Sequence, residues 1–99
     1  MPGTPSPFDL SGRVAVVTGG NGGIGRSIAL GLARAGAAVA VLARDEERNH
    51  RVLAELTNLG VPALALQIDV TKRPALGQAI TQVARGLGGI DILLTSSLA

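Results

Sequence analysis

The residues best suited to chemistry in this chain are glycines that lie close together, at Gly19, Gly20, Gly22, Gly23 and Gly25. Glycine has no Cβ, so backbone N–H groups in such a loop can come very close to phosphate oxygens. The apolar run before the glycines predicts a buried strand, and the apolar spacing after them predicts a helix. A helix N-terminus adds unpaired N–H donors and a partial positive charge. The stretch therefore predicts a phosphate-binding strand, loop and helix.

The glycines fit two motifs. Gly20, Gly22 and Gly25 match the general dinucleotide-binding pattern G-x-G-x-x-G. Read from Thr18 to Gly25, the same stretch spells T-G-x-x-x-G-I-G. In this second form, placed after a strand, it resembles the short-chain dehydrogenase/reductase family. The resemblance covers residues 8–94, which correspond to the first part of a family domain.

The resemblance implies a role for each loop residue. Gly19 would make the tight turn, Gly23 would admit the pyrophosphate, and Gly25 would let the helix pack closely on the strand. Ile24 belongs to the same cofactor-binding motif. Asn21 could donate a hydrogen bond to phosphate, although the tolerance of Asn for a left-handed turn explains it equally well. These five positions are the predicted cofactor-binding residues of the loop.

The resemblance also points to a pair of residues after the third predicted strand. Asp69 and Val70 match an acidic-apolar pair that contacts adenine in the family. The alternative is that Asp69 only helps to cap the helix that follows. Both interpretations stay open at this stage.

The end of the predicted strand 38–43 is where cofactor choice would be made. In dinucleotide-binding folds an acidic residue about 20 positions after the glycines bonds the ribose 2′-hydroxyl of NAD. Here Ala43 occupies the strand end and Arg44 follows, so a guanidinium could pair with the 2′-phosphate of NADP. Asp45 is the competing candidate for an NAD-type contact, but a helix N-cap explains it without a ligand. NADP is the predicted cofactor, and NAD is the alternative.

No catalytic residue can be assigned. The family transfers hydride with a Ser-Tyr-Lys set, in which the Tyr hydroxyl is the general acid/base. This sequence contains no tyrosine, and its one lysine, Lys72, falls at the start of a predicted helix. Where the family has Asn-Asn-Ala-Gly after the fourth strand, residues 95–98 read Thr-Ser-Ser-Leu. The nicotinamide side of the pocket is therefore in doubt, and the chain by itself is expected to be inactive.

Apolar runs alternate along the chain with apolar residues at helical spacing. Strands are predicted at 14–17, 38–43, 63–68 and 90–94, and helices at 23–35, 46–59 and 72–87. This order predicts an α/β fold with a Rossmann-like, doubly wound parallel sheet, cut short after its fourth strand, in strand order 3-2-1-4. The cofactor-binding half domain would span residues 8–94, between a disordered tail at 1–7 and an atypical tail at 95–99.

Several side chains are assigned to helix faces and caps. The first helix is expected to bury a stripe that consists of Ile24, Ile28, Ala29, Leu32 and Ala33. Asp45 is the predicted N-cap of the second helix and Thr71 that of the third. A solvated face is expected on the second helix, made of Glu46, Glu47, Arg48, Asn49 and Arg51.

Composition narrows the class of protein. The 99 residues contain no cysteine and carry a formal net charge of +2, with no basic run or interleaved aromatics. We therefore expect no thiolate metal site, no metal role for His50 and no nucleic-acid partner. The longest apolar run, residues 35–43, is about half of a membrane span. A protein of the cytoplasm, without a membrane partner, is predicted.

The sequence leaves three functions open. The first is the dinucleotide-binding N-terminal part of a short-chain dehydrogenase/reductase, whose intact parent would be an NAD(P)H-dependent oxidoreductase acting on a small alcohol or carbonyl. The second is a non-catalytic nucleotide-binding or regulatory module that pairs with a full-length relative. The third is a phosphate-binding domain unrelated to redox chemistry. Because the sheet would end at its fourth strand, self-association through open strand edges is also expected.

Overall fold

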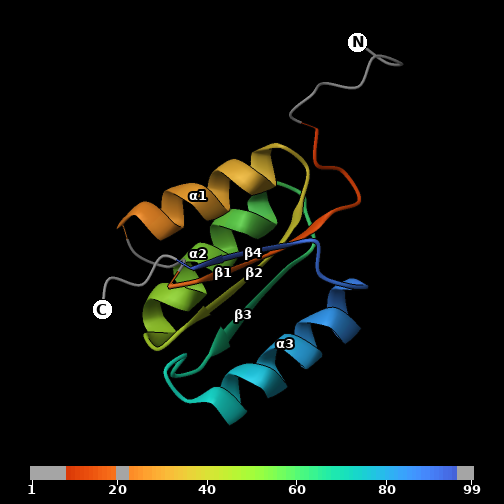
Figure 1. The fold of residues 1–99 in the computed structure, drawn as a ribbon. Helices are drawn as coiled ribbons and strands as arrows, with labels where there is room; N and C mark the ends of the chain where they lie inside the picture. Colours follow the sequence, from red (N-terminus) through yellow and green to blue (C-terminus); the bar gives the residue numbers. More distant parts are fainter. Residues whose placement is uncertain (1–8, 20–22, 96–99) are drawn as a thin grey trace.

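The computed structural model describes residues 9–19 and 23–95, which form a parallel sheet flanked by helices (Figure 1). Strands and helices alternate: β1 (Val14–Thr18), α1 (Gly23–Arg34), β2 (Ala38–Ala43), α2 (Glu46–Asn58), β3 (Ala63–Gln67), α3 (Arg73–Leu87) and β4 (Ile92–Thr95). The strand order is β3-β2-β1-β4, and every pairing is parallel. The predicted doubly wound α/β fold and its order 3-2-1-4 are confirmed.

Helices cover both faces of the sheet, with α1 and α2 on one face and α3 on the other (Figure 1). Successive side chains of a strand point to opposite faces. Val17 of β1 accordingly packs in one core with Leu30 of α1 and Leu56 of α2. Its neighbour Val16 packs in a second core with Val83 of α3. Burial on both faces explains why these strands are continuous apolar runs rather than alternating ones.

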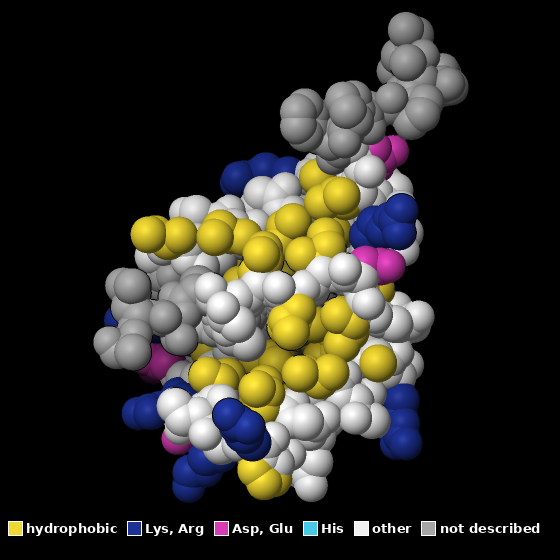
Figure 2. All heavy atoms as spheres, in the orientation of Figure 1, with side chains coloured by type: hydrophobic (Ala, Val, Ile, Leu, Met, Phe, Trp, Pro, Cys, Tyr) yellow, Lys and Arg dark blue, Asp and Glu magenta, His cyan; other side chains and the backbone are white. Residues whose placement is uncertain are grey.

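The sheet is unequally covered. Every residue of β2 is buried, whereas β4, at one edge of the described sheet, alternates between half-buried and exposed residues. Leu93 of β4 is 52% exposed, although the neighbouring Val16 of β1 is fully buried. Hydrophobic side chains gather on this side of the molecule between α1 and α3 (Figure 2). The β4 side of the sheet therefore presents apolar surface.

The buried face of α1 differs from the predicted stripe. Its buried residues are Gly25, Ala29, Leu30 and Ala33, whereas Ile24 is 72% exposed. Successive residues of an α-helix are 100° apart. A face centred between Ala29 and Ala33 consequently leaves Ile24 almost opposite the sheet. The expectation that Ile24 points inward was wrong.

The structure confirms one of the two predicted helix N-caps and contradicts the other. Asp45 caps α2, and its Oδ1 accepts a hydrogen bond from the backbone N–H of Arg48 at 3.1 Å, as predicted. The prediction for α3 was wrong, because its N-cap is Lys72 and makes no side-chain cap bond. The Thr71 hydroxyl instead donates to Asp69 Oδ1 at 2.6 Å.

The predicted segments differ from the observed ones by no more than two residues at any boundary. Strand β3 ends at Gln67, and β4 begins at Ile92 and ends at Thr95. The proposed tail at 1–7 and residues 96–99 lie outside the described residues, as does Asn21. Within 9–19 and 23–95, no helix is long and apolar enough to cross a membrane.

Candidate functional site

Parallel strands bring the predicted site residues to one edge of the sheet. In register, Thr18 of β1 lies opposite Leu42 of β2, and Ala43 of β2 lies opposite Gln67 of β3. The segments that follow these strand ends carry the glycines, Arg44 and Asp69. We call this side of the sheet the carboxyl edge. Ligands of open parallel sheets bind outside the carboxyl ends of the strands.

The turn after β1 has a backbone that favours glycine. Gly19 has φ +69° and Gly23 has φ +46°, in the left-handed region that other residues rarely adopt. The Gly19 N–H donates to the Leu42 carbonyl oxygen at 2.8 Å, which ties the turn to β2. A Cβ added at Gly23 would meet no heavy atom within 4 Å. The start of α1 is therefore open to a group that approaches its backbone.

The first turn of α1 contains no acidic residue. Helix α2, in contrast, is capped by Asp45 and starts with Glu46 and Glu47. Because a helix N-terminus carries a partial positive charge, α1 is better prepared than α2 to stabilise a bound anion. The exposed Ile24 belongs to this first turn, and Gly25 faces the sheet.

Arg44 directly follows β2 and projects from the carboxyl edge, with 75% of its side chain exposed. Its Nη1 lies 3.8 Å from Asp69 Oδ2. Its backbone carbonyl oxygen accepts a hydrogen bond from Gln67 Nε2 at 3.2 Å. The fold thus brings together Arg44 and Asp69, which the sequence presents as separate candidates.

Asp69 organises the turn that precedes α3. Its Oδ1 accepts hydrogen bonds from the Thr71 hydroxyl and, at 3.0 Å, from the Thr71 backbone N–H. These hydrogen bonds, with smaller contributions from the nearby charges of Arg44 and Lys72, hold the pKa of Asp69 below its ordinary value of 3.8. Asp69 is therefore an anion at neutral pH. Val70, next to it, is half-buried and packs against the core under α3.

Asn49 is a site residue that the sequence analysis missed. It was placed on the solvated face of α2, yet it is 3% exposed. Its Nδ2 donates to the carbonyl oxygens of Ala43 at 3.1 Å and Leu66 at 3.4 Å. The signal was present in the sequence, because Asn49 is three residues before Val52 and seven before Leu56, both of them buried.

One ion pair joins the first turn of α1 to α2. Arg26 Nε donates to Glu55 Oε1 at 2.9 Å, and Arg26 Nη2 pairs with the other carboxylate oxygen, Oε2. This hydrogen-bonded pair holds the pKa of Glu55 below its ordinary value of 4.5, against a smaller opposing effect of desolvation. Since Arg26 follows Gly25 directly, the pair fixes the start of α1 against α2.

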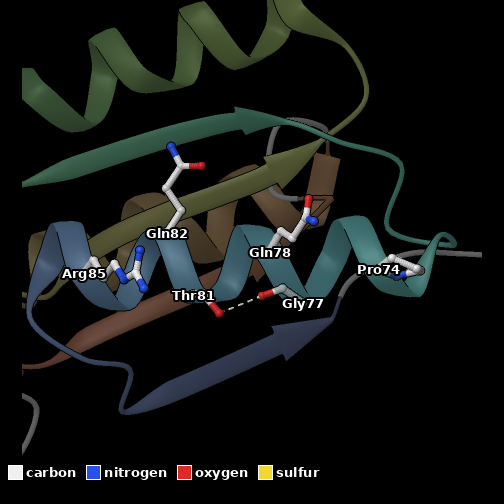
Figure 3. A pocket seen from close by; sticks show the side chains of 6 residues that line it. All are labelled: Pro74, Gly77, Gln78, Thr81, Gln82 and Arg85. Carbon is white, nitrogen blue, oxygen red and sulfur yellow. Dashed lines mark hydrogen bonds between the residues drawn. The ribbon is translucent and has the colours of Figure 1, made fainter.

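Two other hollows do not match a dinucleotide. One is an open depression on the outward face of α3, where the side chains of Gln78, Gln82 and Arg85 do not converge on one point (Figure 3). The other, between α2 and β3, has a volume of about 210 Å³, which is below the ~300 Å³ at which small-molecule pockets begin.

No group of three His, Asp or Glu side chains in the described part of the chain could hold a metal ion. The Nε2 atom of His50 lies 3.7 Å from Oε1 of Glu46, on the surface of α2.

Comparison with known proteins identifies the family. The family model for short chain dehydrogenase matches residues 13–97. The chain belongs to the short-chain dehydrogenase family. It is 40% identical over 98 residues to the hydroxynaphthalene reductase arp2 of Aspergillus fumigatus, a match that covers 98% of this chain and 36% of that protein. The chain thus spans about a third of the length of the curated relatives that it matches.

Solved structures show the same fold. A putative short-chain alcohol dehydrogenase from Sinorhizobium meliloti has a TM-score of 0.82 and 50% identity, covering 87% of this chain and 34% of the other. L-Sorbose reductase from Gluconobacter frateurii, complexed with NADPH and L-sorbose, has a TM-score of 0.87 and 34% identity, covering 95% and 36%. An NAD+-bound xylitol dehydrogenase has a TM-score of 0.82 and 37% identity, covering 85% and 32%. Relatives of this chain therefore include structures with either dinucleotide.

The arrangement at the carboxyl edge suits the binding of a phosphate-containing ligand. It offers a glycine turn, a helix N-terminus and one exposed guanidinium, all of which favour phosphate groups. These residues fit a dinucleotide, since a Cβ added at Gly23 would meet no heavy atom within 4 Å and a cation stands at the end of β2. No tyrosine is available in the sequence to act as the family's acid/base.

Proposed function

We propose that this chain is the dinucleotide-binding N-terminal part of a short-chain dehydrogenase/reductase. The observation that carries the proposal is the meeting of the β1–α1 glycine turn, Arg44 and Asp69 at one carboxyl edge. Gly23 would admit the pyrophosphate, Gly19 would make the tight turn and Gly25 would let α1 pack on the sheet. Asn21 and Ile24 would belong to the same cofactor-binding motif. The adenine would lie against Asp69 and Val70.

NADP is the proposed cofactor, and Arg44 would pair with its 2′-phosphate. Two observations support this choice over NAD. Arg44 projects from the carboxyl edge with its guanidinium largely exposed. Asp45, the candidate for a ribose 2′-hydroxyl contact, is engaged as the cap of α2 and lies 3.6 Å from Arg48 Nε. The exposed Arg44 guanidinium, although it lies beside Asp69, can therefore also meet a 2′-phosphate, whereas the Asp45 carboxylate caps α2.

The intact protein would be an NAD(P)H-dependent oxidoreductase acting on a small alcohol or carbonyl compound. Support comes from its relatives, which include a hydroxynaphthalene reductase and an L-sorbose reductase. The bound nicotinamide would carry the hydride, while the residues of this chain bind and orient the adenosine half of the cofactor. The chain alone is proposed to be inactive, since it has no tyrosine to act as acid/base.

Calorimetric titration of the chain with 2′-phospho-ADP-ribose and with ADP-ribose tests this function. These ligands are the adenosine halves of NADP and NAD, and they need only the part of the pocket that this chain supplies. Saturable binding of both, tighter for the 2′-phosphate by roughly 10- to 100-fold, is expected from charge-assisted hydrogen bonds to Arg44. Tighter binding of ADP-ribose would move the assignment to Asp45 and NAD. No binding by the folded chain would contradict the proposed function.

The alternative is a non-catalytic nucleotide-binding or regulatory module that pairs with a full-length relative or with itself. The exposed Leu93 on β4 favours this second candidate, because apolar edge strands are sites of strand pairing. Sedimentation velocity over a range of concentrations tests the pairing with itself. A compact monomer at high concentration would count against self-pairing. Co-purification with a longer oxidoreductase would instead support pairing with a full-length relative. The location in the cytoplasm stays a prediction from the sequence.

A further inference from the structure

The buried amide of Asn49 reaches from α2 to the carboxyl ends of two strands. A buried polar side chain is costly unless its hydrogen bonds are made, so such a residue usually fixes a particular arrangement. The Asn49 Nδ2 donates to the carbonyl oxygens of Ala43 and Leu66, at 3.1 and 3.4 Å. Ala43 is the last residue of β2 and precedes Arg44, while Leu66 precedes Gln67 at the end of β3. Asn49 therefore ties together the two strand ends that carry the adenosine side of the site.

A second amide holds Arg44 from the other side. Gln67 Nε2 donates to the Arg44 backbone carbonyl oxygen at 3.2 Å. Arg44 thus lies between two held carbonyl groups. The carbonyl oxygen of Ala43 accepts a hydrogen bond from Asn49, and that of Arg44 accepts one from Gln67. We call Asn49 and Gln67 the amide clamp. Together with the Ile68 backbone N–H, which donates to the Ala43 carbonyl oxygen at 3.0 Å, the clamp fixes the point from which the Arg44 side chain extends.

Fixing that point matters because the Arg44 side chain is long and three-quarters exposed. An exposed arginine has many rotamers, and holding its guanidinium against a phosphate loses that freedom. A fixed backbone limits the region that the guanidinium can reach. The charge of Asp69, 3.8 Å away, biases it further toward the carboxyl edge.

We propose that Asn49 and Gln67 are positioning residues that set Arg44 for the 2′-phosphate and thereby determine the preference for NADP over NAD. This inference rests on the proposed function. A purely structural role would predict something different, because loss of fold would weaken every ligand equally. A positioning role predicts a selective loss, confined to the ligand that carries the 2′-phosphate.

The test measures the ratio of the Kd of ADP-ribose to the Kd of 2′-phospho-ADP-ribose by calorimetry, with the full chain and matched variants. Asn49→Leu removes the buried donor at similar volume, and Gln67→Met removes the exposed donor. Asn58→Leu in the last turn of α2 and Gln82→Met on the outward face of α3 are the controls, since both positions are exposed. One neutral hydrogen bond corresponds to roughly a two- to tenfold change. We expect the ratio to fall by about that factor in each clamp variant, with the Kd of ADP-ribose and the controls unchanged.

A double-mutant cycle makes the outcome specific. In an Arg44→Ala background, where no guanidinium remains to be positioned, Asn49→Leu and Gln67→Met should no longer change the ratio. An unchanged ratio in Gln67→Met and in folded Asn49→Leu, or equal weakening of both ligands, would overturn the inference while leaving the proposed function intact. Circular dichroism reports whether Asn49→Leu folds, and if it does not, Gln67→Met at its exposed position decides the result. A wild-type ratio near one would overturn the proposed NADP preference and the inference together.

Discussion

The two ends of the proposed dinucleotide site use different chemical groups, backbone groups at one end and charged side chains at the other. At the pyrophosphate end, Gly19, Gly23 and Gly25 offer backbone groups, open space and a helix N-terminus. At the adenosine end, Arg44 and Asp69 offer charged side chains, and other side chains hold them in place. The pyrophosphate end thus depends on residues without side chains. The adenosine end depends on charged side chains that other side chains hold in place.

This difference determines how each end should respond to substitution. A side chain added at the pyrophosphate end obstructs every ligand, because all dinucleotides share that group. A side chain lost at the adenosine end changes which ligand is preferred, because the 2′ position distinguishes NADP from NAD. Substitutions at the two ends should therefore affect affinity and selectivity separately.

The largest effect is expected at the pyrophosphate end, from Gly23→Val. A β-branched residue is strained at φ +46°, and its side chain would fill the open space at the start of α1. The affinity for both ADP-ribose and its 2′-phosphate should fall by more than roughly 100-fold, from strain and lost anion contacts together. Calorimetry measures the loss, with Gly77→Val on the exposed face of α3 as a matched control. If Gly23→Val kept its affinity for both ligands, the claim that the pyrophosphate binds at the Gly23 backbone would be wrong.

A smaller and selective effect is expected at the adenosine end, from Arg44→Ala. Loss of the guanidinium should lower the affinity for 2′-phospho-ADP-ribose by roughly 10- to 100-fold and leave ADP-ribose unchanged. The matched control is Arg85→Ala, an exposed arginine on the outward face of α3. Equal weakening of both ligands would show that Arg44 supports the fold and does not choose the cofactor.

Asp69→Asn separates the two interpretations of Asp69. If its carboxylate accepts a hydrogen bond from the adenine amino group, both ligands should weaken by roughly three- to tenfold, because they share adenine. We expect this result. The Thr71 turn can persist, since asparagine also supports such turns. Unchanged affinity for both ligands would leave Asp69 with a structural role only, and the adenine contact would be wrong.

The smallest effect is expected from Glu55→Gln, which breaks the ion pair between Arg26 of α1 and Glu55 of α2. A partly exposed pair contributes little, so Tm at neutral pH should fall by a few degrees at most. Because the folded state lowers the pKa of Glu55, its contribution is present above the ordinary value of 4.5 and is lost as pH falls through the lower, folded value. Thermal melts of wild type and variant should therefore converge in acid. A Tm difference that does not shrink as the pH falls below 4.5 would contradict this account.

The sequence predicted the local structure of the glycine turn better than the side-chain contacts around Arg44 and Asp69, for a physical reason. A left-handed turn and a close approach to backbone demand glycine, so Gly19 and Gly23 carry the information in their own identity. The β-α alternation likewise follows from local apolar patterns, and the sheet order was predicted correctly. The start of α1 shows the limit, because the exposure of Ile24 depends on how the helix rotates on the sheet.

The adenosine end depends on contacts between distant segments. Arg44 and Asp69 were both candidates, but their proximity follows from the pairing of β2 with β3. Asn49 was assigned to solvent because asparagine is polar, although its spacing to Val52 and Leu56 places it on the buried face. Its partners are backbone carbonyls of other segments, which no local pattern in the sequence reveals.

The central claim is that the carboxyl edge binds the adenosine half of a dinucleotide at two physically different ends. Backbone amide NMR of the labelled chain, titrated with 2′-phospho-ADP-ribose, tests it most directly. We predict saturable shifts at Gly19, Gly23, Arg44 and Asp69, and none at Gln82 on the outward face of α3. Titration with ADP-ribose should reproduce the glycine shifts and lose most of the Arg44 shift. Shifts confined to α3, or no saturable shift in the folded chain, would contradict the account.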